Sequence, residues 1–202
     1  NLVIGSAKPI SETLCQHPAV RLISFTGSTE VGKVLAAATA PHVKRLALEL
    51  GGNAPFIVFE DADLQAAADA LMANKFRSGG QTCVCTNRVY AHSRIIKPFV
   101  DLVAERVREL SVGDGMNPET DIGPLIDRAG FDKVAEHVAD SLSKGARRIV
   151  GDDPPRPNDN WGCFYPPTLL VDIKPGGLVY REQTCGPVLA FRQLDETDAV
   201  LH

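Results

Sequence analysis

The sequence predicts an α/β fold with a mainly parallel sheet flanked by helices. Short apolar, β-rich runs alternate with longer segments of good helix formers along the 202 residues. We expect strands at residues 20–26, 44–50, 55–59, 84–91, 168–172 and 188–194. We expect helices at residues 29–40, 96–110 and 126–144, and one that begins at Asp61 or Asp63 and ends at Arg77. This alternation is typical of parallel sheets.

Patterns within the segments support these elements. The run at 20–26 stops at Gly27 and suits a buried strand. Two of the expected helices carry apolar residues at helical spacing. These are Leu64, Ala67, Ala68, Leu71 and Phe76 in one helix and Phe99, Leu102, Val103, Val107 and Leu110 in the other. Residues 113–124 and 151–162 are rich in Gly, Pro, Asp and Asn, which predicts surface loops.

Composition argues against several classes of partner. The formal net charge is −4 and basic residues are scattered, so nothing indicates nucleic-acid binding. No apolar run approaches the ~20 residues that span a bilayer, so we expect no membrane partner. Five cysteines are an odd number in a chain too large to need disulfides, which favours a reducing, cytoplasmic compartment. The adjacent glycines Gly51 and Gly52 suggest a domain boundary, with residues 1–51 on one side and 52–202 on the other.

A glycine loop from Gly27 to Val34 follows a strand and opens a helix. Such a helix start favours an anion such as phosphate. The NTPase loop needs a hydroxyl where Val34 stands, and Glu30 would repel a triphosphate. The dinucleotide fingerprint is incomplete because Thr29 replaces its middle glycine. A non-standard dinucleotide loop with Ser28 facing a phosphate and a plain strand-to-helix turn both remain open.

Cys83 and Cys85 lie on a loop after Gly79 and Gly80. The Cys-x-Cys spacing lacks the further ligands of a zinc site, so we expect no metal. A cysteine on a glycine-rich loop is a candidate nucleophile, because glycines allow close approach of a substrate. The alternative is a small apolar core residue.

Glu49 stands between two leucines at the end of an expected strand, just before the glycine pair. Partial desolvation there would raise the pKa of the carboxyl group toward the range of a general base. A solvated charge at the strand end is the alternative reading.

Several motifs together resemble the aldehyde dehydrogenase superfamily in order and spacing. They are Ser24–Gly32 (SFTGSTEVG), Leu48–Pro55 (LELGGNAP), Gly80–Cys83 (GQTC), Asp121–Leu125 (DIGPL) and Gly186–Val188 (GPV). The run Gly80–Arg88 (GQTCVCTNR) is most similar to succinate- and glutarate-semialdehyde dehydrogenases. The resemblance implies the end of a Rossmann-like NAD(P)-binding domain at 1–51 and a catalytic domain at 52–202 that is incomplete at its C-terminus.

The resemblance also implies a mechanism. Cys83 would attack the aldehyde to give a thiohemiacetal, hydride would pass to NAD or NADP, and Glu49 would activate water to release the acid. The Cys83 N–H would supply part of the oxyanion hole. In such enzymes the cysteine that matches Cys85 can form a redox-switch disulfide with the nucleophile.

The resemblance further implies the residues that hold the cofactor. Ser28 and the first helical turn after Gly27, with Gly32 in the same loop, would face the pyrophosphate. The backbone of Leu50 and Gly51 would lie near the nicotinamide. The residue at position 183 would hold the ribose.

Three positions depart from the family pattern. Gln183 replaces the usual ribose-binding Glu, Cys185 replaces an aromatic residue beside the nicotinamide, and Ser78 replaces a common Asn. We expect a chain that corresponds to the middle two-fifths of a family member, which works as a homo-oligomer on a small aldehyde. An inactive relative is the alternative. A cysteine hydrolase would need a histidine base, and the histidines at 17, 42, 92, 137 and 202 are expected at solvated positions or on helix faces.

Overall fold

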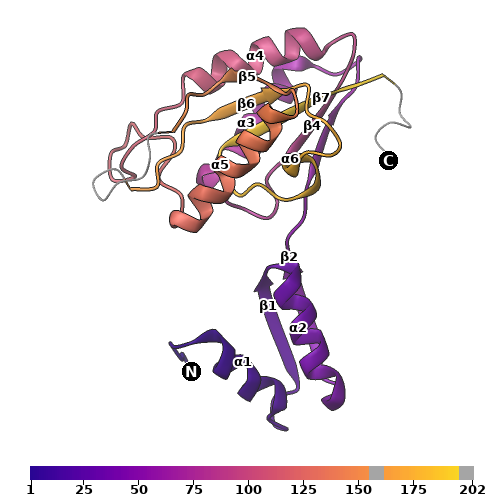
Figure 1. Cartoon of the computed structure of the whole chain (residues 1–202), viewed down its shortest axis with the longest axis vertical. Helices are drawn as coiled ribbons and strands as arrows, with labels where there is room; N and C mark the ends of the chain where they lie inside the picture. Colours follow the sequence, from indigo (N-terminus) through magenta and orange to yellow (C-terminus); the bar gives the residue numbers. More distant parts are fainter. Residues whose placement is uncertain (155–161, 196–202) are drawn as a thin grey trace. The chain divides into compact units, whose positions relative to one another are not determined.

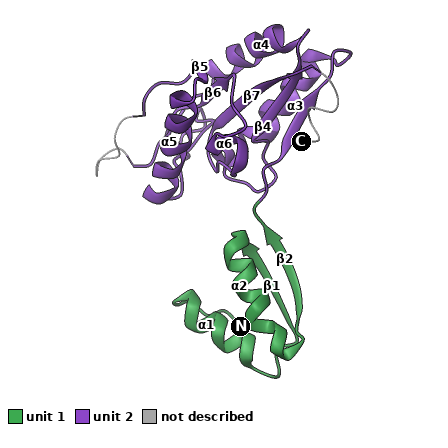
Figure 2. Cartoon of the chain, turned by 45° about the vertical axis from the view of Figure 1, so that its right-hand side comes forward, with its two compact units in different colours: residues 1–51 green, residues 52–202 purple. Residues whose placement is uncertain are grey.

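The protein is described by a computed structural model over residues 1–154 and 162–195. The chain forms two compact units, Asn1–Gly51 and Gly52–His202 (Figure 2). The boundary between them along the chain falls at the glycine pair singled out in the sequence, while the assignment of the units to cofactor binding and catalysis stays a prediction. The predicted loop at 151–162 lies partly outside the described residues, as does His202.

The first unit contains two parallel strands and their helices (Figure 1). Its elements are α1 (Ala7–Gln16), β1 (Leu22–Gly27), α2 (Thr29–Thr39), a 3-10 turn η1 (Ala40–His42) and β2 (Arg45–Leu50). The strands pair in parallel with Gly27 opposite Leu50, so their carboxyl ends lie at one edge. Helix α1 was not predicted, although Ala7, Ile10 and Leu14 stand at helical spacing.

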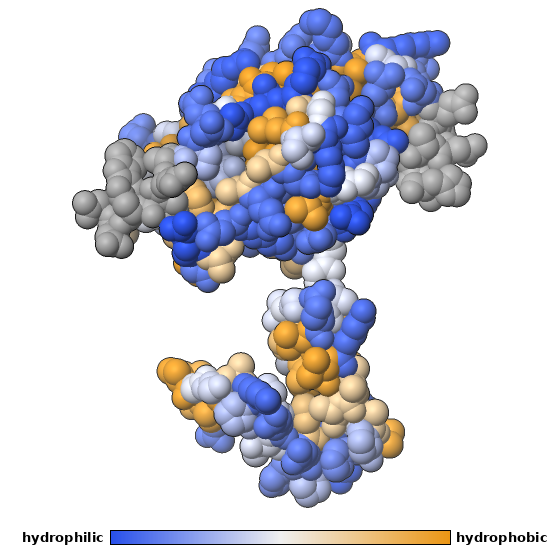
Figure 3. All heavy atoms as spheres, in the orientation of Figure 1, coloured by the Kyte–Doolittle hydropathy of each residue, from blue (hydrophilic) through white to orange (hydrophobic). Residues whose placement is uncertain are grey.

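The expectation that β1 is buried is wrong for this chain. Its side chains alternate between half-buried and exposed, and Leu22 is 51% exposed. One face of the two-stranded sheet, which includes Phe25 and Leu48, is the less exposed one. The other face, which includes Thr26 and Glu49, is open because this unit holds no second layer to cover it. Apolar side chains are accordingly visible at the surface of this unit (Figure 3).

The second unit is built on a five-stranded sheet with the order β3-β4-β7-β6-β5. The strands are β3 (Pro55–Val58), β4 (Arg88–His92), β5 (Arg147–Val150), β6 (Thr168–Val171) and β7 (Val188–Leu194). The helices are α3 (Leu64–Lys75), α4 (Ile96–Arg108), α5 (Arg128–Ser143) and α6 (Leu178–Arg181), with a 3-10 turn η2 (Arg77–Gly80). All pairings are parallel except that of the edge strand β5 with β6. The predicted mainly parallel α/β fold is confirmed, although β5 and α6 were missed.

Helices cover both faces of this sheet (Figure 1). Alternate residues of β7 show the two layers. Leu189 and Phe191 pack into the core that contains α3 and α4, whereas Val188 and Ala190 pack into the core that contains α5 and α6. Burial on both faces explains why the central strands are nearly continuous apolar runs.

Local hydrogen bonds set one boundary that the sequence left open and correct another that it placed too early. Asp63, not Asp61, caps α3, because its carboxylate accepts the backbone N–H groups of Gln65 and Ala66. The strand expected from residue 84 begins only at Arg88. A turn closed by the Cys85 N–H and the Thr82 carbonyl occupies the positions before it.

Candidate active site

The loop that carries Cys83 lies between η2 and β4, and η2, which leads into it, departs from right-handed helical geometry. Ser78, Gly79 and Gly80 all have positive φ, at 52°, 62° and 76°. A Cβ on Gly80 would lie 2.1 Å from the carbonyl oxygen of Gly186, so only glycine fits there. The loop therefore packs directly against the Gly-Pro segment that precedes β7. Cys83 itself is exposed, as a nucleophile must be.

Gln81 fixes the other side of this loop. Its Nε2 donates to the carbonyls of Ser78 and Pro124, at 3.2 and 3.4 Å, and its Oε1 accepts the Ile126 N–H at 2.9 Å. Pro124 belongs to the Asp121–Leu125 motif, so this motif supports the cysteine loop. The loop is thus held between two segments that are distant in sequence.

Gln183 also contacts the loop. Its Nε2 donates to the Thr82 carbonyl and its Oε1 accepts the Gly52 N–H, both at 3.3 Å. The residue named from the sequence as a cofactor ligand therefore lies beside the residue that precedes Cys83. Cys185 is exposed, as Cys83 is.

Cys85 is buried and points elsewhere. Its thiol reaches the Asn74 carbonyl at the end of α3 at 3.3 Å, and the Thr82 Oγ1 lies 2.7 Å from its sulfur. All five cysteines are free in this structure. A bridge to Cys83 would require Cys85 to leave these contacts, so the redox switch stays a prediction.

Glu49 lies at the end of β2 in the first unit and is exposed. The expected partial desolvation of its carboxylate is therefore not found in this chain. The physical reason is its register: Glu49 pairs with Thr26 on the face of the two-stranded sheet that no helix covers. Its role as general base remains a prediction.

The glycine loop of the first unit shows two structural roles. Ser28 caps α2, because its Oγ accepts the Val31 N–H at 3.3 Å. Gly32 is buried against β2, where a Cβ would lie 2.7 Å from Leu50 Cδ2. Close helix–strand packing is one of the functions of glycine in dinucleotide-binding loops. Gly27, Leu50 and Gly51 lie together where both strands end.

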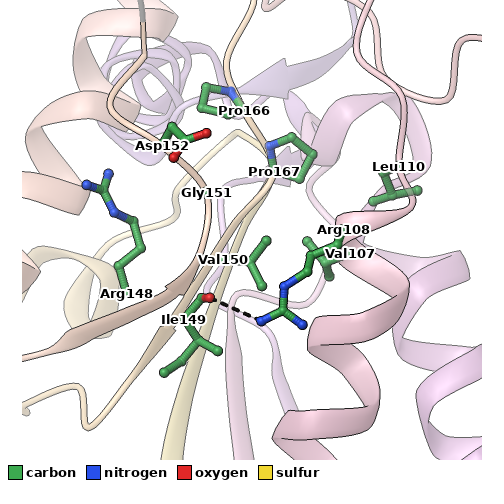
Figure 4. Close-up of a pocket in the computed structure, with 10 residues that line it drawn as sticks. All are labelled: Val107, Arg108, Leu110, Arg148, Ile149, Val150, Gly151, Asp152, Pro166 and Pro167. Carbon is green, nitrogen blue, oxygen red and sulfur yellow. Dashed lines mark hydrogen bonds between the residues drawn. The ribbon is translucent and has the colours of Figure 1, made fainter.

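A cavity of about 410 Å³ lies away from these loops, at the edge strand β5 (Figure 4). Its walls include Arg108, Arg148, Asp152 and Pro167, and none of its lining residues belongs to the cysteine loop. Arg108 donates to the Ile149 carbonyl at 3.5 Å (Figure 4). Among the described residues, no group of His, Cys, Asp or Glu has a metal-binding arrangement. No helix in the described ranges is long and apolar enough to cross a membrane.

Comparison with known proteins decides the family. The description "Aldehyde dehydrogenase family" fits the whole chain, residues 1–202. The chain belongs to the aldehyde dehydrogenase family. It is 45% identical over 201 residues to the NADP(+) succinate-semialdehyde dehydrogenase of Escherichia coli, covering 99% of this chain and 41% of that protein. It is 44% identical to the glutarate-semialdehyde dehydrogenase of Pseudomonas aeruginosa, again over 99% of this chain and 41% of the relative.

Solved structures agree with this assignment. An oxidoreductase from Marinobacter aquaeolei matches all of this chain and 41% of its own, with a TM-score of 0.95 and 52% identity. A succinate-semialdehyde dehydrogenase from Burkholderia pseudomallei matches 98% of this chain and 41% of its own, with a TM-score of 0.94 and 45% identity. This aldehyde dehydrogenase chain thus spans about two-fifths of the length of the relatives it matches.

Two buried polar residues of the aldehyde dehydrogenase chain were missed. Lys75 is fully buried at the end of α3, with its Nζ 3.4 Å from Asn87 Oδ1. His137 is also buried: it lies on a face of α5, one of the two settings expected for the histidines, and its Nδ1 lies 2.7 Å from Thr184 Oγ1. Lys75 follows Leu71 by four residues and so lies on the apolar face of α3, and His137 lies on the buried face of α5. This helical spacing is the sequence feature that could have indicated their burial.

Burial lowers the pKa of Lys75 to about 8, and the nearby Cys85 and Cys185 partly offset this effect. We expect Lys75→Met to stabilise the fold by roughly 1 to 2 kcal/mol at pH 7, because removal of the buried charge outweighs loss of its hydrogen bond to Asn87 Oδ1. Between pH 8 and 10.5 the unfolded wild type binds a proton that the folded one does not. The wild type therefore gains stability over that range, and the stability difference between the Lys75→Met variant and the wild type shrinks.

Urea unfolding of both proteins at pH 7 and pH 10 measures this difference. Lys174→Met, at an exposed lysine, is the control and should change stability by less than about 0.5 kcal/mol. A Lys75→Met protein less stable than the wild type at pH 7 would show that the ammonium makes contacts that outweigh its desolvation.

Proposed function

We propose that this chain is part of an NAD- or NADP-dependent dehydrogenase that oxidises an aldehyde to the carboxylic acid. The proposed substrate is a semialdehyde such as succinate semialdehyde, because relatives of this name are 45% identical to the chain. The observation that carries the proposal is the exposed Cys83 thiol on a loop held from both sides by Gln81 and Gln183. A nucleophile needs both access and a fixed position.

The arrangement of the first unit fits a dinucleotide. Two parallel strands end together at Gly27 and Leu50, and α2 begins immediately after, at Ser28. Nucleotides bind at the carboxyl ends of parallel strands and at helix N-termini. Ser28 and the first turn of α2, through Gly32, would hold the pyrophosphate, and Leu50 and Gly51 would lie near the nicotinamide. The bound cofactor would accept the hydride.

The chain's own residues would perform the remaining steps. The Cys83 thiolate attacks the aldehyde carbon, and the new C–S bond gives a thiohemiacetal. The Cys83 N–H donates to the oxygen that becomes negative. After loss of hydride the carbon is a thioester, and Glu49 removes a proton from the water that displaces the sulfur. From the resemblance we also infer a homo-oligomer in the cytoplasm.

The test compares two exposed thiols of one chain. Cys83 and Cys185 are both exposed, whereas Cys15 is buried, so accessibility alone does not separate the first two. We expect iodoacetamide to modify Cys83 faster than Cys185 at pH 7, measured by peptide mass spectrometry. Equal rates would favour an inactive relative, which the Gln183 and Cys185 departures also motivate.

Turnover is tested with the protein expressed from its complete reading frame. Succinate and glutarate semialdehydes, each with NAD and with NADP, should give cofactor reduction at 340 nm. Hydrolysis of esters with no cofactor reduction by any aldehyde would instead support the cysteine hydrolase.

A further inference from the structure

The Gln183 amide makes two hydrogen bonds that a carboxylate could not make together. The Gly52 N–H needs an acceptor and the Thr82 carbonyl needs a donor, and both groups lie 3.3 Å from the amide. A carboxylate has acceptors only, so a Glu at this position would lose the bond to Thr82. The amide thereby joins the first residue of the second unit to the residue before Cys83.

The segment that carries Gln183 is itself anchored from α5. The neighbouring Thr184 is 3% exposed and its Oγ1 lies 2.7 Å from Nδ1 of His137, which is 1% exposed. Buried hydrogen bonds of this kind hold a unique conformation, because breaking one leaves a polar group without a partner. Two residues later, Gly186 packs against Gly80 of the cysteine loop.

We propose that Gln183 is a positioning residue for the Cys83 nucleophile, and that the His137–Thr184 hydrogen bond holds Gln183 in place. This inference rests on the proposed role of Cys83. It gives the departure from Glu a function: the amide holds the loop through protein contacts, whereas a Glu would keep only the acceptor for Gly52. Neither His137 nor Thr184 is placed at the cofactor, so their effect on Cys83 acts through this chain of contacts.

The test separates the two hydrogen bonds of the amide by hydrogen exchange. Gln183→Met removes both bonds, and Gln183→Glu keeps the acceptor for Gly52. The Cys85 N–H closes the loop turn by donating to the Thr82 carbonyl, so its exchange reports on that carbonyl. In the Met variant we expect about fivefold faster exchange of both the Gly52 N–H and the Cys85 N–H, the effect of one lost hydrogen bond. In the Glu variant only the Cys85 N–H should accelerate. Gln16→Glu, at an exposed glutamine in α1, should change neither.

A kinetic readout uses Thr184→Val in the protein from the complete reading frame. This variant keeps size and charge and removes the bond to His137. We expect a burst of cofactor reduction slowed about fivefold with an unchanged KM for the cofactor. Unchanged exchange in both Gln183 variants, or an unchanged burst in Thr184→Val, overturns the positioning role while leaving Cys83 as the nucleophile. Slow iodoacetamide labelling of Cys83 in the wild type instead overturns the proposed function, whatever the exchange rates are.

Discussion

Replacement of Cys83 by alanine is expected to lower aldehyde oxidation by at least about 10⁴-fold, the scale on which loss of a covalent nucleophile acts. In the proposed mechanism the sulfur forms the bond to the aldehyde carbon, and alanine leaves no nucleophile at this position. Because Cys83 is exposed and makes no core contact, the variant should fold as the wild type does. Steady-state cofactor reduction and a thermal melt measure the two quantities.

Two other cysteines provide matched controls. Cys163→Ala removes a half-buried thiol that packs against the core of α5 and α6, and should leave turnover within a few-fold of the wild type. Cys85→Ala removes the buried thiol that contacts Asn74, and is expected to affect stability more than chemistry. Residual turnover of the Cys83→Ala protein at more than a few per cent of the wild-type rate is incompatible with covalent catalysis by this residue.

Glu49→Gln is expected to separate the two halves of the reaction. The amide cannot accept a proton from water, so release of the thioester should slow by about 10²- to 10⁴-fold. In the proposed mechanism, attack by Cys83 and loss of hydride do not require this carboxylate, so a burst of reduced cofactor should persist. Stopped-flow absorbance at 340 nm resolves the burst from the steady state.

We expect this substitution to leave folding unchanged, because Glu49 is exposed and its replacement leaves no unpaired buried group. Glu12→Gln, at an exposed glutamate in α1, is the control for loss of one negative charge from the same unit. Disappearance of the burst together with the steady-state rate would assign Glu49 a role before thioester formation.

The buried Lys75 illustrates a conflict between stability and position in this fold. Burial lowers the pKa of its ammonium group, yet Lys75 stands next to the loop that carries the proposed nucleophile, where its carbonyl accepts from the Cys85 thiol. Strongly shifted titratable groups gather at functional sites. Its stabilising replacement by Met therefore also measures how much the loop depends on that charge.

Local sequence determined the elements whose patterns are strong. Periodic apolar residues placed α3 and α4 within a few positions, and continuous apolar runs placed β6 and β7. The motifs around Gly27, Glu49 and Cys83 indicated the family, because their order and spacing can be read directly from the sequence. The short elements β5 and α6 had no such signal, whereas α1 was overlooked although its apolar residues stand at helical spacing.

Long-range packing determined the rest, because burial and hydrogen bonding depend on which distant segments meet. Only the fold shows that Gln183 and Gln81 hold the Cys83 loop, since their partners lie 101 and 45 residues away. The same is true of Lys75 and His137, whose burial follows from the cores on either side of the sheet. The alternation within β2 puts Glu49 on the face opposite to Leu46, Leu48 and Leu50, but only the fold shows that this face of the two-stranded sheet is open.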